Sequence, residues 1–401
     1  MSDDSVTRYG DRTSHRVGLV SGEGFGKFFK LLHSLPKESL ISLSTGEPDF
    51  GTPQHICQAA IDAIKKGWTK YTPSPGFPEL RQAVAEDLEK RYGIKYDPET
   101  EIIMTVGSSE AMDLAFRAVL DPGDEVIMPD PHYLCYPSCI VMAGGIPVPA
   151  PTSVENDFKL EVTGVEALVT HRTGAILFGN AANPTGTEME RGVLEGIASL
   201  AERHDLLVIA DEIYSCFTYG VEHTCFASLP GMKQRTILLD GFSKRYAMTG
   251  WRLGYAAGPA DIIAAMVRIH QHTMLCPPSM AQMAAIAALK GGDTDTRRVI
   301  AEYDRRRRVI VEGLNRIGLA CFEPKGAFYA FPSIQSTGMS SEEFAEKLLV
   351  EEKVMVLPGN LFGKQGEGFV RCCYATAMPD IEEALRRMAR FVKRYKSRTR
   401  P

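Results

Sequence analysis

Short apolar runs alternate with longer amphipathic stretches between about residue 55 and residue 295 of this 401-residue chain. The runs are residues 102–104, 125–128, 175–178, 206–210 and 236–239. The stretches between them repeat apolar residues at helical spacing, as in 190–203. Continuous apolar runs separated by helices are typical of a mostly parallel sheet that is covered by helices on both faces. The pattern therefore predicts an α/β fold whose large domain has three αβα layers.

The rhythm of the chain changes after this region. A long helical pattern over 296–317 is followed by short strand and helix patterns, and the last helix is expected over 379–396. We expect a large domain of residues 51–295 and a smaller α+β domain made of residues 1–50 and 296–401. Ligands of open, mostly parallel sheets bind beyond the carboxyl ends of the strands, so the chemistry is expected there.

Composition and charge disfavour several classes of protein. The formal net charge is −5, and the one basic cluster, 305–308, belongs to a helical pattern, so we expect no nucleic-acid partner. No stretch approaches the roughly 20 apolar residues that a membrane helix needs, so we expect no membrane partner. The nine cysteines contain no CxxC pair, and residues 1–16 lack the apolar core of a signal peptide. We therefore expect a cytoplasmic protein with reduced thiols.

Two charged residues follow apolar runs near their carboxyl ends. Asp211 comes directly after 206–210, and Lys244 follows 236–239 after a short segment. Taken alone, Asp211 is better explained as an N-cap of the next segment, and Lys244 as a solvated surface residue. A carboxylate at the inner end of a buried strand nevertheless requires a cationic partner, and the segment after Lys244 is apolar and aromatic. We interpret both residues as facing one ligand.

Two turn motifs lie at the ends of other runs. Gly-Ser-Ser at 107–109 opens a helix, where glycine permits close approach and free N–H groups form an anion cradle. By itself this motif is explained as well by a plain helix N-cap, and it lacks the spacing of nucleotide-binding loops. Asn183 belongs to an Asn-Pro-Thr-Gly turn. The order in which these motifs occur with the charged residues favours a phosphate-bearing ligand.

Several segments together resemble the class I and II aminotransferases, the aspartate aminotransferase superfamily of pyridoxal-phosphate enzymes. The segments are 46–50, 71–76, 121–125, 183–186, 211–214, 243–244, 249–252, 326–329 and 371–375, and the resemblance covers roughly residues 20–395. Each segment alone can arise by chance, but the ordered set is highly specific. The resemblance implies the fold of pyridoxal-phosphate-dependent transferases, pyridoxal 5'-phosphate as the cofactor, and a homodimer.

The resemblance assigns catalytic roles to Lys244, Asp211 and Tyr214. Lys244 would hold the cofactor as a Schiff base and then carry a proton, for which its pKa must be lowered. Asp211 would face the ring nitrogen of the cofactor and keep it protonated, so that the ring can accept electrons. Tyr214 and Asn183 would form hydrogen bonds with the phenolic oxygen of the cofactor, and Tyr133 would stack on the ring.

The resemblance also implies where phosphate and substrate bind. The phosphate would lie among Ser108, Ser109, Ser243 and Arg252. Tyr71 would reach across a dimer interface to the phosphate of the neighbouring subunit, so that two subunits share each active site. Arg371 would bind the substrate α-carboxylate through a bidentate fork, assisted by Gly46 and Asn183. A surface salt bridge is the alternative for Arg371, but its apolar strand pattern disfavours that role.

We expect an aminotransferase that moves an amino group between an amino acid and a 2-oxo acid such as 2-oxoglutarate by a ping-pong mechanism. Position 109 is serine, whereas one branch of aspartate aminotransferases has a lysine there for a dicarboxylate, so an aromatic or other neutral donor is favoured. The aromatic segment 24–29 could contact an apolar substrate side chain or could belong to an amphipathic helix.

Other activities stay open at this point. A carbon–sulfur lyase or an aminocyclopropane-carboxylate synthase-like enzyme would use the same cofactor residues. A non-catalytic regulator of this fold would carry an N-terminal helix-turn-helix module, for which we expect too few residues before Gly46. A nucleotide-binding α/β protein is disfavoured because the phosphate-loop motifs are missing.

Overall fold

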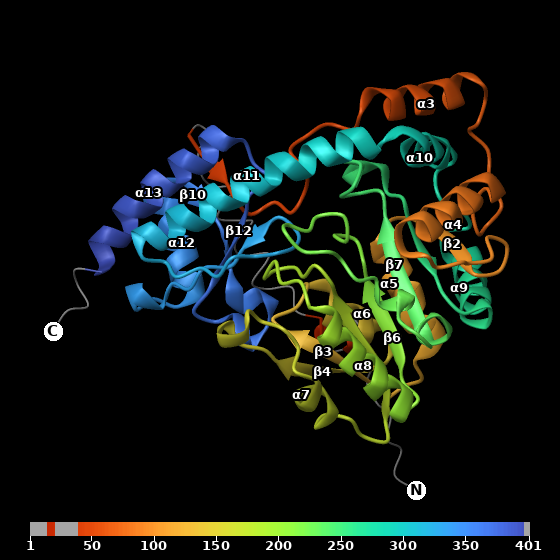
Figure 1. Cartoon of the computed structure of the whole chain (residues 1–401), viewed down its shortest axis with the longest axis horizontal. Helices are drawn as coiled ribbons and strands as arrows, with labels where there is room; N and C mark the ends of the chain where they lie inside the picture. Colours follow the sequence, from red (N-terminus) through yellow and green to blue (C-terminus); the bar gives the residue numbers. More distant parts are fainter. Residues whose placement is uncertain (1–13, 21–38, 397–401) are drawn as a thin grey trace, which may run out of the picture.

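The central element of the molecule is a seven-stranded sheet with the strand order β2-β8-β7-β6-β5-β3-β4. The computed structural model describes residues 14–20 and 39–396 (Figure 1). The strands are β2 (Ile102–Thr105), β3 (Glu125–Asp130), β4 (Ile146–Pro151), β5 (Thr173–Gly179), β6 (Leu207–Asp211), β7 (Thr236–Gly241) and β8 (Gly254–Ala257). All neighbouring strands are parallel except β8, which is antiparallel to both β2 and β7. The mostly parallel sheet predicted from the sequence is confirmed.

The five predicted apolar runs form β2, β3, β5, β6 and β7, whereas β4 and β8 were not predicted. β4 has the sequence Ile-Pro-Val-Pro-Ala-Pro, and it lies at the edge of the sheet. Edge strands tolerate proline because one side of the strand makes no ladder hydrogen bonds. β8 is short and begins with glycine. Neither strand therefore carries the pattern of a buried strand.

Helices cover both faces of the sheet because successive strand residues point to opposite sides. Leu177 and Ile209 belong to a core formed with α5, α6 and α9, whereas their neighbours Ile176 and Val208 belong to a core formed with α8. The helices of these layers are α3 (Gln54–Lys65), α4 (Pro78–Tyr92), α5 (Ser108–Val119), α6 (Cys135–Ala143), α7 (Val162–Glu166), α8 (Arg191–Arg203), α9 (Ala260–Thr273) and α10 (Ser279–Gly291). The predicted three-layer arrangement is thus present.

A smaller α+β domain packs beside the sheet. Its helices are α11 (Asp293–Ile317), α12 (Ser341–Glu352) and α13 (Met378–Lys396), and its strands are β1 (Ile41–Ser42), β9 (Tyr329–Ala330), β10 (Val354–Met355), β11 (Leu357–Pro358) and β12 (Val370–Cys373). β12 lies between β11 and β9 in an antiparallel sheet, and β1 pairs with β10 in parallel. α11 runs from α10 to α12 and α13, so one long helix joins the two domains (Figure 1). The exact domain boundaries stay a prediction.

The first 50 residues were expected to pack against the smaller domain. β1 does so through its pairing with β10. The short helix α1 (His15–Gly18) instead lies against α6, where Nη1 of Arg16 donates to the carbonyl oxygen of Met142 at 3.2 Å. This difference arises because the end of α6 offers a free carbonyl group to the arginine. The aromatic segment 24–29 lies outside the described residues.

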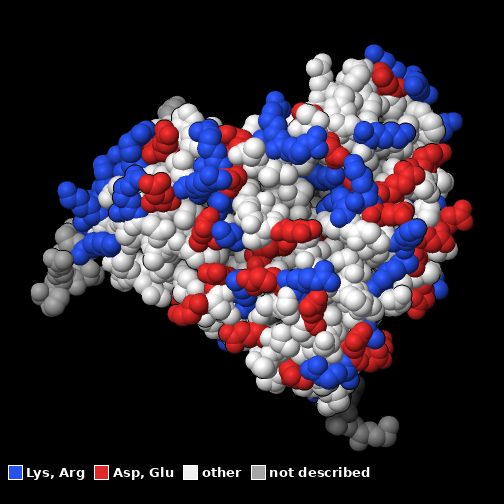
Figure 2. All heavy atoms as spheres, viewed as in Figure 1, with Lys and Arg blue, Asp and Glu red and all other residues white. Residues whose placement is uncertain are grey.

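The surface carries both signs of charge. Figure 2 shows lysine and arginine side chains interspersed with aspartate and glutamate over the face in view. Within residues 14–20 and 39–396, no helix is long and apolar enough to cross a membrane. The same residues contain no group of His, Cys, Asp or Glu side chains arranged to hold a metal ion.

Candidate active site

A cavity of about 940 Å³ lies where the carboxyl ends of the sheet strands meet the strands of the smaller domain. Asp211 at the end of β6 and Arg371 on β12 line it from the two sides. The structure brings these predicted residues together in its wall: Gly46, Ser108, Ser109, Tyr133, Asn183, Asp211, Tyr214, Ser243, Lys244, Arg252 and Arg371. Tyr71 is the predicted site residue that does not line this cavity. Residues far apart in the sequence therefore face one space.

Lys244 lies in the turn that follows β7, and its amine faces the cavity. Nζ donates to the carbonyl oxygen of Gly46 at 2.6 Å and lies 5.8 Å from the ring centre of Tyr214. Burial lowers the pKa of the Lys244 amine to about 8, and the positive charge of Arg371 acts in the same direction. More of this amine is neutral near pH 7 than of an exposed lysine. A neutral amine is the form that attacks a carbonyl carbon.

Asp211 ends β6 and is only 8% exposed. Its Oδ2 accepts a hydrogen bond of 2.9 Å from the hydroxyl of Tyr136, and its Oδ1 accepts one of 3.3 Å from the backbone N–H of Ile213. Burial raises the pKa of Asp211 to about 6, and the bond from Tyr136 opposes this rise. Among the described residues, no Lys, Arg or His forms an ion pair with this carboxylate. Asp211 is therefore ready to accept a cationic group from a ligand.

An anion site is formed where α5 begins. Gly107 precedes the helix with a φ of 77°, and a Cβ at this position would lie 2.6 Å from Nη2 of Arg252. Only glycine allows the guanidinium to approach the helix start so closely. Nη1 of Arg252 donates to the carbonyl oxygen of Thr249 at 3.0 Å, and no acidic side chain of the described part of the chain pairs with this arginine. Free N–H groups at a helix start together with a cation suit a phosphate.

Arg371 is 5% exposed and lies between two aromatic rings. Its guanidinium carbon is 4.4 Å from the ring centre of Tyr329 and 5.0 Å from that of Phe362. Nη1 donates to Oδ1 of Asn183 at 2.9 Å, Nη2 donates to the carbonyl oxygen of Ser44, and Nε has no partner among the described residues. All of these acceptors are neutral. The positive charge is therefore held rigidly while no protein carboxylate neutralises it, as a carboxylate-binding site requires.

Residues 38–388 match the family described as aminotransferase class I and II. The chain belongs to this family. Its members depend on pyridoxal 5'-phosphate, so the predicted family, enzyme class and cofactor are confirmed. The buried Asp211, the desolvated Lys244 amine and the anion site at α5 fit such a cofactor, which carries a ring nitrogen, an aldehyde and a phosphate.

Individual relatives cover almost the whole aminotransferase. YugH of Bacillus subtilis is 48% identical over 379 residues, which are 94% of this chain and 98% of that protein. An aspartate aminotransferase of Pyrococcus abyssi is 44% identical over 386 residues, which are 96% of this chain and 99% of the relative. The solved structure of an aromatic aminotransferase from Pyrococcus horikoshii has a TM-score of 0.88 at 44% identity and covers 92% of this chain and 99% of that one. The predicted fold class agrees with this similarity.

Two tyrosines of the aminotransferase site received no role from the sequence. Tyr136 binds Asp211, and its ring lies 5.6 Å from that of Tyr133 in an edge-on contact. Tyr329 shares a hydrogen bond between hydroxyl groups with Tyr214, and a Cβ on Gly46 would collide with its hydroxyl oxygen. Tyr329 belongs to the segment 326–329 that supports the family resemblance, which was an available signal. No pattern in the sequence distinguishes Tyr136.

The rim of the cavity carries one further polar pair. Nδ2 of Asn360 donates to Oε1 of Glu342 at 3.0 Å, and both residues line the cavity. The cations of the described lining are Lys244, Arg252 and Arg371. The rim therefore carries an acidic side chain, Glu342, and the described lining contains no cation other than these three.

Proposed function

We propose that this aminotransferase transfers an amino group from an aromatic or other neutral amino acid to a 2-oxo acid such as 2-oxoglutarate. The observation that carries the proposal is that one cavity holds a desolvated amine, Lys244, and a buried, unneutralised guanidinium, Arg371, apart from the exposed Arg252 of the anion site. Donor and acceptor both carry an α-carboxylate, and the described lining offers a single unassigned fork for it. The two substrates must therefore use the same place in turn, as in a ping-pong mechanism.

Each predicted cofactor residue has a role in this proposal. Lys244 is the covalent attachment point, and Asp211 supports the positive charge of the ring nitrogen. Tyr214 and Asn183 bind the phenolic oxygen of the cofactor, and Tyr133 stacks on its ring. The phosphate is bound by Ser108, Ser109, Ser243 and Arg252. When bound, pyridoxal 5'-phosphate supplies a positively charged ring that withdraws electrons from the Cα atom of the substrate.

The pKa of Lys244 supports its second role as the proton carrier. A group with a pKa of about 8 can both take up and release a proton near neutral pH. Arg371 holds the substrate carboxylate at one fixed place, so the Cα–H bond of every substrate faces the same side of the cavity. Burial on the side of Arg371 and Tyr329 excludes water from this space.

The charges of the cavity support a neutral donor. Lys244, Arg252 and Arg371 all have assigned partners in the proposal, so no described cation remains for a second carboxylate. This absence disfavours aspartate as the donor, and the distal carboxylate of 2-oxoglutarate as the acceptor would have to be bound by uncharged groups. Ser109 and the acidic rim residue Glu342 offer no compensation. The relatives carry both kinds of name, aspartate and aromatic aminotransferase, so the donor must be measured.

A homodimer with shared sites is part of the proposal. Tyr71 is 84% exposed. The chain beside it is held in place, because Ser279 donates to the carbonyl oxygen of Trp68 at 2.6 Å and the N–H of Thr72 donates to Sγ of Cys276 at 3.5 Å. Further exposed apolar side chains lie on α3, just after α3 and just after α9: Ile61, Ile64, Trp68, Met274 and Leu275. A fixed, exposed tyrosine among apolar residues suits a contact with a second copy of the chain.

All nine cysteines are free, which supports a cytoplasmic protein.

The decisive experiment follows single half-reactions. Wild-type protein loaded with the cofactor is mixed with one amino acid at a time, and the loss of the yellow colour is recorded. We expect aromatic or other neutral amino acids to react faster than aspartate, and faster reaction with aspartate would contradict the donor assignment. Release of pyruvate and ammonia from cystathionine would favour the carbon–sulfur lyase instead.

Two variants test the residues. Lys244→Ala should neither turn over nor form a cofactor link that borohydride can reduce. Tyr71→Ala should retain Lys244 but bind the phosphate so weakly that little activity remains. If sites are shared, mixing the two inactive proteins restores activity, because a mixed dimer contains one site with both residues intact. No restoration after confirmed subunit exchange would contradict the shared site.

A further inference from the structure

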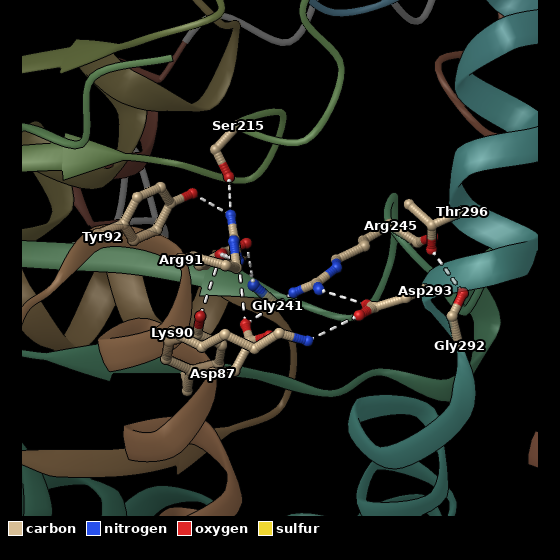
Figure 3. A network of polar contacts seen from close by, with 12 residues as sticks. Asp87, Lys90, Arg91, Tyr92, Ser215, Gly241, Arg245, Gly292, Asp293 and Thr296 are labelled. Atoms are coloured by element: carbon tan, nitrogen blue, oxygen red, sulfur yellow. Dashed lines mark hydrogen bonds and ion pairs between the residues drawn. The ribbon is translucent and has the colours of Figure 1, made fainter. Parts of the chain in front are cut away.

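A cluster of charged side chains lies directly behind the turn that carries Lys244. Lys244 lines the cavity, but the next residue, Arg245, does not. The guanidinium of Arg245 instead lies between the carboxylates of Asp87 and Asp293 (Figure 3). The side chains of these two neighbouring residues therefore have different surroundings. Lys244 faces the cavity, and Arg245 belongs to the ionic cluster.

Arg245 connects two helices to this turn. Its Nη1 donates to Oδ2 of Asp87 on α4 at 2.7 Å, and its Nη2 donates to Oδ1 of Asp293, the first residue of α11, at 3.0 Å. The backbone carbonyl of Arg245 accepts a further bond of 3.1 Å from the hydroxyl of Thr296. The side chain of Arg245 is only 13% exposed. Both its charge and its backbone are thus fixed just after Lys244.

Arg91 connects the same cluster to the other end of the turn. Its Nη1 lies 3.2 Å from Oδ2 of Asp87 and 3.5 Å from Oδ2 of Asp240. Asp240 precedes the turn, and its Oδ1 accepts a bond of 2.7 Å from the N–H of Gly241. Nη2 of Arg91 also donates to Oγ of Ser215 at 2.7 Å, and Ser215 follows the cavity residue Tyr214 (Figure 3). One arginine therefore contacts both the end of β7 and the loop that follows β6.

We propose that Asp87, Arg91, Asp240, Arg245 and Asp293 form a positioning network that fixes the amine of Lys244 in the cavity. The inference rests on the role of Lys244 proposed above. Asp87 is the centre of the network, because its Oδ2 accepts from both arginines. Through hydrogen bonds the network holds the backbone on both sides of Lys244, and it connects this turn to the start of α11.

The function of such a network is geometric. A lysine side chain has a flexible four-carbon stem, so the position of its amine depends on how firmly its backbone is held. Buried ion pairs contribute little net stability compared with apolar packing, but their directional hydrogen bonds define one arrangement. α11 leads into the domain that carries Arg371. The network therefore also relates the amine to the carboxylate-binding residue across the domain junction.

The test is the substitution Arg245→Lys, which keeps the charge but removes the fork that bridges two carboxylates. Arg307→Lys is the matched control, because Arg307 is also buried and also pairs with two carboxylates, Asp304 and Glu323. No hydrogen bond of Arg307 goes to the turn after β7. Both variants should show a similar decrease in melting temperature.

For Arg245→Lys we expect kcat to fall about tenfold while the KM of the amino donor changes less than about twofold, because misplacement of a reacting group slows the chemical step. The rate at which cofactor-free protein forms a borohydride-reducible link with added pyridoxal phosphate should fall similarly. Arg307→Lys should leave both rates unchanged. If the two lysine variants behave alike in both rates, the network is only structural and the proposal is wrong.

A milder variant covers the case in which Arg245→Lys does not fold. Asp293→Asn removes the negative charge of one of the two carboxylates that Arg245 bridges. Because this carboxylate is partly exposed, we expect a smaller fall in the same two rates. Unchanged rates would overturn the proposal. Lys244→Ala keeps the two hypotheses apart, because persistence of the reducible link in that variant would contradict the role of Lys244 itself rather than the network.

Discussion

The adjacent strands β6 and β7 each carry a buried aspartate at their carboxyl end, as the last residue of β6 and the last but one of β7, but the two carboxylates have different partners. Asp240 on β7 is 5% exposed and lies 3.5 Å from Nη1 of Arg91, and it accepts a bond of 3.0 Å from the hydroxyl of Tyr255. Asp211 on β6 has the hydroxyl of Tyr136 and, among the described residues, no cation. The same residue type at neighbouring positions of one sheet thus occurs once with and once without a protein counter-ion.

The difference separates a structural carboxylate from a functional one. Burial raises the pKa of both groups to about 6, and only at Asp240 does a nearby arginine oppose the rise, which it offsets in part. An ionised carboxylate without a cation destabilises the folded protein. Asp211 therefore suits a ligand that brings its own positive charge, whereas Asp240 already has a cationic partner in the protein. Substitutions of the two aspartates should have opposite consequences.

The largest effect is expected for Asp211→Asn. This variant removes the charge that would support the cofactor ring, so kcat should fall about 100- to 1000-fold. The melting temperature of the cofactor-free protein should stay the same or rise, because an unpaired buried charge is lost. The two measurements are steady-state kinetics and a thermal melt. A rate within tenfold of the wild type would contradict the proposed role of Asp211.

Asp240→Asn is the matched substitution on the neighbouring strand. Here the loss falls on Arg91, which keeps only Asp87 and shares that carboxylate with Arg245. We expect the free energy of unfolding of the cofactor-free protein to fall by about 3 kcal/mol, because a buried cation loses a partner. Urea unfolding of both asparagine variants measures the contrast. Equal stability of the two would show that the arginine does not distinguish the strands.

The pH dependence of stability gives a third contrast. The pKa of Asp211 is raised to about 6, so between about pH 4 and pH 6 the folded protein holds a proton that the unfolded chain has released. The stability contributed by this proton is present at low pH and is lost as the pH rises through this range. Asp211→Asn should therefore become more stable than the wild type by about 2–3 kcal/mol above pH 6, and the difference should shrink towards pH 4.

Unfolding of cofactor-free protein at several pH values measures this difference. The comparison between the two proteins cancels the groups that titrate in both. Loading with cofactor should reduce the difference, because the ring nitrogen then supplies the missing positive charge. A difference that is constant with pH would contradict the raised pKa of Asp211.

The sequence predicted the fold well where burial produces a simple pattern. β5 and β6 are buried on both faces and therefore appear as continuous apolar runs. β4 lies at an edge and contains prolines, so the same rule does not detect it. α11 begins at Asp293, before the predicted start at 296, because the residues that fix its first turn lie on α4 and on the turn after β7. Such contacts between distant segments leave no periodic pattern.

The same distinction applies to the site. The resemblance to the family assigned the predicted site residues, and the structure brings all of them except Tyr71 together in one cavity. Arg91 and Asp87 could not be assigned, because on α4 they have the spacing of an ordinary helical ion pair. Their relation to Asp240 depends on how α4 packs. Tyr136 was missed for the same reason, since it lies on α6 and its partner, Asp211, lies at the end of β6.

Tyr136→Phe is the mildest of these substitutions, because it leaves both aspartates in place. The variant removes the hydroxyl that favours the charged form of Asp211, so the pKa of that carboxyl should rise further above 6. At neutral pH we expect kcat to fall about threefold to tenfold, as for the loss of one hydrogen bond to a charged group. The acid side of the pH–rate profile should move to higher pH.

Tyr255→Phe is the control, because it removes the equivalent hydroxyl from Asp240. This variant should leave the profile in place, since Arg91 still stabilises that carboxylate. Equal displacement of both profiles would show that the hydroxyl at Asp211 has no special importance for the reaction.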